Sequence, residues 1–254
     1  MFPREHGAYA QIGFPLVTAL ALGRPGPSAV LLVLAIVAVF LLHEPLMVLI
    51  GARGGRAKRE AGSTARRRAA ILTVVALAAG GAGLWLAPPM ARATALIPLI
   101  FGALLVPLIF SRREKTAAGE LLVAWSLSTT LVPVAVAAGV QPEAALTAAG
   151  VWAIAFSLST LTVRAIIARA KKRQPSGLMP VIAPSLCAAA IALALYLAAR
   201  DDFPALAAIA VVPTALVALA FGLLRVHPRN LRRMGWSLVA SNLAVLAALL
   251  IGLR

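Results

Sequence analysis

The stretch from Ser28 to Ala52 reads SAVLLVLAIVAVFLLHEPLMVLIGA and decides the fold. It is apolar on all sides and longer than the roughly 20 residues that a helix needs to cross a bilayer. Backbone polar groups find no partners in lipid, so a spanning segment satisfies them internally as a helix. The other spanning structure, a β-barrel, needs alternating polarity, which this stretch lacks. Residues 28–52 are therefore predicted to form a membrane-spanning helix.

Similar apolar runs recur along the whole chain of 254 residues, which is 61% hydrophobic with a mean hydropathy of +0.94. A soluble domain of this length is closer to half apolar. We expect nine spans, at residues 8–23, 28–52, 69–87, 94–110, 119–139, 144–167, 180–199, 204–224 and 234–253. No connection is long enough for a soluble domain. The pattern predicts an all-α polytopic bundle forming one transmembrane domain over residues 1–254.

The 24 lysine and arginine residues are distributed unevenly between the two sides of this predicted bundle. One side carries only four of them, Arg24, Arg92, Arg200 and Arg254, and all the others fall on the side of the N-terminus. The positive-inside rule then places the N-terminus inside and the C-terminus outside. The net charge of +16 is thereby explained by orientation and by contact with anionic lipids, and no nucleic-acid partner is expected.

His43 and Glu44 interrupt the quoted stretch and are the first candidates for chemistry. His43 lies ten residues before Arg53, about 15 Å inside the helix end at 1.5 Å per residue. A charge at such depth costs roughly 2.5–3.5 kcal/mol and tends to face the bundle interior. Neighbouring side chains point about 100° apart, so we expect each to find a partner on another helix. The HEPLM sequence lacks the second histidine of a zinc-protease motif, because Met47 takes that place.

Two further segments place ionisable residues at the same predicted end. The N-terminal segment REHGAYAQ (4–11) puts Arg4 and His6 at the entrance of the bundle. The segment SRREKTAAGE (111–120) has a structural interpretation, a capping box from Ser111 to Glu114 and Glu120 at the positive end of a helix. Its functional interpretation is an anion-binding loop, in which Gly119 permits close approach and the donors are Arg112, Arg113 and Lys115.

Three of these motifs, REHGAYAQ (4–11), HEP (43–45) and EKTAAGE (114–120), resemble the YwiC-like family of bacterial membrane proteins. The family's hallmark is an N-terminal segment that Arg4, Glu5, His6, Gly7, Ala8 and Tyr9 fill here. The resemblance extends over most of the chain. It implies a multi-pass protein of the bacterial cytoplasmic (inner) membrane and says little about activity.

A weaker resemblance concerns architecture: the predicted nine helices are similar to UbiA-type intramembrane prenyltransferases. Those enzymes hold a prenyl diphosphate through Mg²⁺ on aspartate-rich motifs of helices two and six. Here the first place holds His43, Glu44, Arg53 and Arg56, and the second, LTVRAIIARAKKR (161–173), has no acid. Arginine and lysine in these places would bind an anion directly rather than through metal. Mg²⁺ therefore remains a candidate cofactor without assigned ligands, and the single cysteine, Cys187, makes a multi-cysteine metal site impossible.

These observations leave three functions open. The first is a UbiA-like enzyme acting on an isoprenoid diphosphate or another lipid with an anionic head. The second is a transporter for an anion or a proton-coupled solute, which predicts interrupted helices in matching positions. The third is a membrane scaffold, which would tolerate Glu44→Gln and His43→Ala. For the enzyme we expect catalytic roles for Glu44, His43, His6 and Glu120, and substrate binding by Arg4, Arg53, Arg56, Arg112, Arg113, Lys115 and Arg164.

Overall fold

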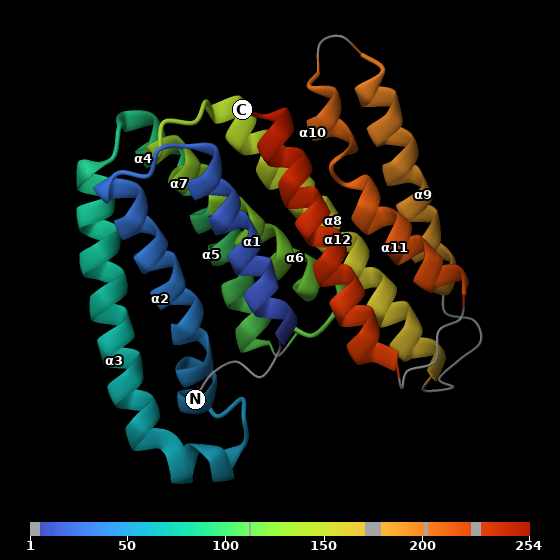
Figure 1. Cartoon of the computed structure of the whole chain (residues 1–254). Helices are drawn as coiled ribbons and strands as arrows, with labels where there is room; N and C mark the ends of the chain where they lie inside the picture. Colours follow the sequence, from blue (N-terminus) through green and yellow to red (C-terminus); the bar gives the residue numbers. More distant parts are fainter. Residues whose placement is uncertain (1–5, 112, 171–178, 201–202, 225–229) are drawn as a thin grey trace.

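The computed structural model describes all residues except 1–5, 112, 171–178, 201–202 and 225–229. In the described residues every regular element is a helix (Figure 1). The helices are α1 (His6–Leu22), α2 (Pro27–Leu49), α3 (Gly55–Leu86), α4 (Pro89–Thr94), α5 (Leu96–Phe110), α6 (Ala117–Thr129), α7 (Leu131–Ala137), α8 (Pro142–Ala170), α9 (Met179–Ala198), α10 (Ala205–Ile209), α11 (Val212–Leu223) and α12 (Leu231–Gly252).

The helices form a polytopic bundle, as the hydropathy pattern predicts. Eight segments of the described chain are long and apolar enough to cross a membrane, and α1 is a shorter apolar helix beside them. Three of the eight spans consist of two helices in succession: α4 with α5, α6 with α7, and α10 with α11. The all-helical fold class is therefore confirmed, and every expected span has its counterpart.

The beginning of α3 differs from the expectation. The sequence predicts a basic loop followed by a span over residues 69–87, whereas α3 is already helical from Gly55 and runs for 32 residues. The extra residues are mostly alanine, arginine, lysine and glutamate, which favour helices, and no proline interrupts them. The basic segment after α2 is thus mainly a helical extension of α3, which curves beneath α2 in Figure 1.

Prolines explain where the three divided spans break. In each, the first helix ends four residues before a proline: Thr94 before Pro98, Thr129 before Pro133, and Ile209 before Pro213. Proline has no N–H to donate to the carbonyl four residues earlier, which favours a break at that residue, although Pro15, Pro45, Pro107 and Pro184 lie inside continuous helices. The short helices α4, α7 and α10 that result lie at the same end of the bundle as the C-terminus (Figure 1).

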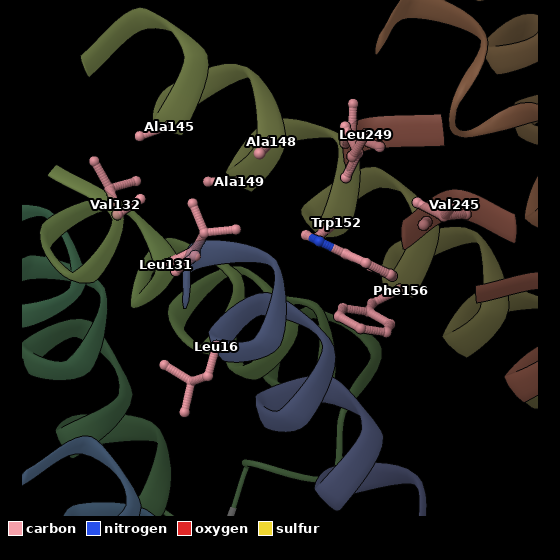
Figure 2. Packing of buried hydrophobic residues seen from close by; sticks show 14 of the residues in the cluster. Leu16, Leu131, Val132, Ala145, Ala148, Ala149, Trp152, Phe156, Val245 and Leu249 are labelled. Atoms are coloured by element: carbon pink, nitrogen blue, oxygen red, sulfur yellow. The ribbon is translucent and has the colours of Figure 1, made fainter. Parts of the chain in front are cut away.

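The centre of the bundle is the contact of α1, α7, α8 and α12 (Figure 2). Trp152 of α8 is fully buried there and stacks between Phe14 and Phe156, with ring centroids 5.2 and 5.3 Å away. Its indole Nε1 donates to the Thr18 hydroxyl at 2.9 Å, and that hydroxyl donates to the Phe14 carbonyl at 2.7 Å. A large apolar side chain with a satisfied polar edge thereby joins two helices far apart in sequence.

Candidate functional site

Glu44 finds its partner within its own hairpin and not on a separate helix. Arg53 Nε donates to Glu44 Oε1 at 3.0 Å, and the second guanidinium nitrogen donates to Oε2 at 2.5 Å. Gly51 and Gly54 adopt positive φ angles of 78° and 95°, which glycine tolerates, and they form the turn after α2. This turn brings Arg53 back to α2, so the expectation of a partner from another helix is wrong for Glu44. His43 beside it is exposed, so the expectation that it faces the bundle interior is wrong, and it interacts with another residue.

Glu120 and Arg164 form a second pair, between α6 and α8. Arg164 NH1 lies 2.8 Å from Glu120 Oε2, and it also donates to the Lys115 carbonyl at 3.0 Å. Both side chains are about one-third exposed. The pair fixes the segment before α6 to α8, which brings together three residues that the sequence analysis had assigned to the site.

The turn before α6 is held by Thr116 and Gly119. The Thr116 side chain accepts from the Gly119 N–H at 3.2 Å, so Thr116 is the N-cap and the predicted capping box of Ser111 and Glu114 is wrong. A Cβ atom at Gly119 would lie 2.6 Å from the Glu114 carbonyl oxygen and 2.7 Å from that of Arg113. The glycine is needed because the chain's own backbone packs against it.

The charged side chains of this turn differ in exposure. Arg113 and Lys115 are exposed, and no described acidic residue pairs with either. Between them, Glu114 is half-buried, and its Oε2 atom is buried without a hydrogen-bond partner among the described residues. Two exposed cations therefore lie near the positive end of α6, together with the carboxylates of Glu114 and of Glu120 in the first turn, and the exposed side chains of the two cations can bind an anion.

The remaining predicted site residues lie elsewhere or outside the described structure. Arg56 pairs with Glu60 at 2.7 Å on the exposed first turns of α3. Arg4 and Arg112 fall outside the described residues, as does the side chain of His6 at the start of α1. The structure thus joins Glu44 with Arg53, and Glu120 with Arg164 and the Lys115 carbonyl, as two pairs from different helix contacts.

The carboxylates do not fit a magnesium centre of the UbiA type. Among the described residues, no three histidine, cysteine, aspartate or glutamate side chains gather as metal ligands would. Glu44 and Glu120, the two acids assigned to the site, each bind an arginine instead. Mg²⁺ prefers carboxylate and phosphate oxygens in octahedral geometry. Of the acids near the predicted site, Glu44 and Glu120 are engaged by arginines, and a single carboxylate at Glu114 with one unpartnered oxygen does not form a UbiA-type cluster.

Sequence reasoning missed a buried polar cluster between α11 and α12. The Thr214 hydroxyl lies 3.1 Å from the Ser241 hydroxyl and donates to Asn242 Oδ1 at 3.1 Å, and all three side chains are buried. It also missed Arg169, whose guanidinium donates to the carbonyls of Gly222 at 2.7 Å and Pro180 at 3.0 Å. The signal for the cluster was an asparagine and neighbouring hydroxyls inside apolar spans, a pattern typical of helix packing in membranes.

Comparison with protein families adds one finding. The family model described as YwiC-like protein matches residues 2–135. The chain belongs to the YwiC-like family. The match includes all three motifs that carry the resemblance and the Glu44–Arg53 pair, and it ends within α7. It is shorter than the resemblance suggested, and Arg164 lies beyond it. No curated protein and no solved structure matches the chain.

Proposed function

We propose that this YwiC-like protein is an enzyme of the bacterial inner membrane that handles a lipid with an anionic head, such as an isoprenoid diphosphate, in a UbiA-like bundle. The head would bind at the basic end of the bundle, which we place on the cytoplasmic side. The observation that carries the proposal is the turn before α6, where Arg113 and Lys115 are exposed beside a helix N-terminus without acidic partners.

The proposed binding is direct and needs no metal bridge. Guanidinium and ammonium groups donate charge-assisted hydrogen bonds to phosphate oxygens, and Arg112 is close to them in sequence. The Glu120–Arg164 pair would hold this turn in position, because Arg164 also bonds the Lys115 carbonyl. Glu44, held by Arg53, and the neighbouring His43 are the candidate proton-transfer groups, since carboxylate and imidazole side chains are common general acids and bases in enzymes.

The test is a thermal-unfolding series of the protein in nanodiscs with prenyl diphosphates of several chain lengths, each with Mg²⁺ or with EDTA. A ligand that binds the native state raises the melting temperature by mass action. We expect an increase that persists in EDTA and is lost in R113Q/K115Q. The matched control is R232Q/R233Q, two exposed arginines at the start of α12. No increase with any diphosphate would refute the proposal.

A second candidate, a transporter, is favoured by the three proline-divided spans. Spans α4–α5 and α10–α11 break at similar depths, after six and five residues, and both start from the same end of the bundle. Interrupted helices in matching positions are typical of transporter substrate sites. The test is anion uptake into proteoliposomes by the wild type and by variants with Pro98 and Pro213 replaced by alanine. Uptake that is lost in these variants, together with a melting temperature that no diphosphate raises, would favour this function over the first.

A further inference from the structure

Helix α3 has one packed face and one free face. Of the described helices only α2 makes an extensive contact with it. The contact uses small residues: Ala65, Ala69, Ala79 and Gly83 are buried, and the Gly83 carbonyl accepts from the Ser28 hydroxyl at 3.2 Å. Small side chains let two membrane helices approach closely, so α2 and α3 form a hairpin that leaves the opposite side of α3 to its surroundings.

The free face carries arginines in its first half and large apolar residues in its second half. At about 100° per residue, Arg59, Arg66 and Arg67 fall within the same arc of roughly 100° as Val74, Leu77 and Trp85. The centre of this arc lies about 150° from Ala65 and Gly83, on the side of α3 that faces away from the contact with α2. All six side chains are exposed, with Leu77 at 72% and Trp85 at 81%.

The arginines of this face are not neutralised within the described part of the chain. The nearest acid in sequence, Glu60, is paired with Arg56. No described acidic residue pairs with Arg59, Arg66 or Arg67. A row of exposed cations on a helix next to a membrane attracts anionic lipid, at roughly 1 kcal/mol per residue near the surface.

The length of α3 places these arginines at the level of the lipid phosphates. The part from Ala69 to Leu86 is about 27 Å long at 1.5 Å per residue, close to the roughly 30 Å of a hydrocarbon core. Arg66 and Arg67 therefore lie just outside the apolar layer. Trp85 lies near its other boundary, where tryptophan is enriched.

From this continuity of basic and apolar surface we propose that the free face of α3 binds an anionic phospholipid, with the phosphate on Arg66 and Arg67 and the acyl chains along Val74 and Leu77. Arg59 lies two turns further along the same face and extends the basic surface. The lipid supplies the packing that no described helix provides on this side. The site is separate from the turn before α6 and does not rest on the proposed function.

The test uses the purified full chain in nanodiscs of phosphatidylcholine alone or with phosphatidylglycerol. We expect phosphatidylglycerol to raise the melting temperature of the wild type, and R66Q/R67Q to lose at least half of that increase. The control R232Q/R233Q removes two exposed arginines from another helix and should keep the increase. Equal melting temperatures of all three proteins in phosphatidylcholine alone would establish that the substitutions do not disturb the fold.

Two results would overturn the proposal. One is that both double variants lose the phosphatidylglycerol-dependent rise in melting temperature to the same extent, which would indicate diffuse attraction by net charge. The other is that phosphatidylglycerol raises the melting temperature of R66Q/R67Q as much as that of the wild type. As a second readout, native mass spectrometry counts the phosphatidylglycerol molecules retained on release, and R66Q/R67Q should retain fewer than the control. Loss of diphosphate binding in R113Q/K115Q is measured separately, so the two proposals succeed or fail independently.

Discussion

The core around Trp152 and the α2–α3 hairpin both join helices within one bundle, yet they use different side chains. The core interleaves a tryptophan and two phenylalanines and buries a hydroxyl with them. The hairpin uses alanine and glycine, and a Cβ atom at Gly83 would lie only 3.1 Å from the Leu32 nitrogen. The difference indicates that α1, α7 and α8 form the densely packed centre of the described structure, whereas α3 packs mainly on α2.

Removing the central aromatic residue should give the largest effect. We expect Trp152→Ala to lower the free energy of unfolding by about 3–5 kcal/mol, because it opens a cavity and leaves the Thr18 hydroxyl without its donor. The measurement is reversible unfolding in mixed micelles. Trp85→Ala is the matched control, since this tryptophan is 81% exposed. Equal losses in both variants would mean that the core does not hold the bundle.

The α2–α3 hairpin should be destabilised by a large side chain at Gly83 and not by one at Gly81. In Gly83→Leu the new side chain meets Leu31 and Leu32, and we expect a loss of about 1–3 kcal/mol from overpacking. Gly81→Leu is the control, because nothing lies within 4 Å of a Cβ atom there. Spin-label distances between α2 and α3 should lengthen in Gly83→Leu alone. An effect of Gly81→Leu as large as that of Gly83→Leu would place the contact face elsewhere.

The ion pairs should give the smallest effects, ranked by their exposure. A double-mutant cycle on Glu44 and Arg53 should give a coupling of about 1 kcal/mol or less, because Arg53 remains 34% exposed. The pair of Arg56 and Glu60, 85% and 62% exposed, should give about 0.3 kcal/mol. A larger coupling for the second pair would contradict the ranking of the two sites by burial.

The sequence predicted the membrane fold well because the signal is the length of each apolar run. Every span was located to within a few residues except at the start of α3. The basic residues there were assigned to a loop, because a pattern of charges does not show whether the segment is helical. The breaks in α4–α5, α6–α7 and α10–α11 were not predicted, because proline alone does not decide them: Pro15, Pro45, Pro107 and Pro184 lie inside continuous helices.

The site was predicted less completely, because ion pairing depends on how the chain turns back. Nothing in the order of residues shows that Gly51 and Gly54 return Arg53 to Glu44, or that Arg164 reaches Glu120 from 44 positions away. The contact of Trp152 with Thr18 was likewise not predicted, because the sequence of an apolar span does not show which of its faces packs against another helix.

We propose above that an anionic lipid head binds at the basic end of the bundle, beside Arg113 and Lys115. The most direct test is crosslinking with a photoreactive prenyl diphosphate in EDTA, followed by peptide mapping. We expect labelling of the peptides around residues 111–121, and we expect excess unlabelled diphosphate to prevent it. Specific labelling confined to α4, α7 and α10, at the opposite end, would contradict it and favour a substrate site at the proline breaks.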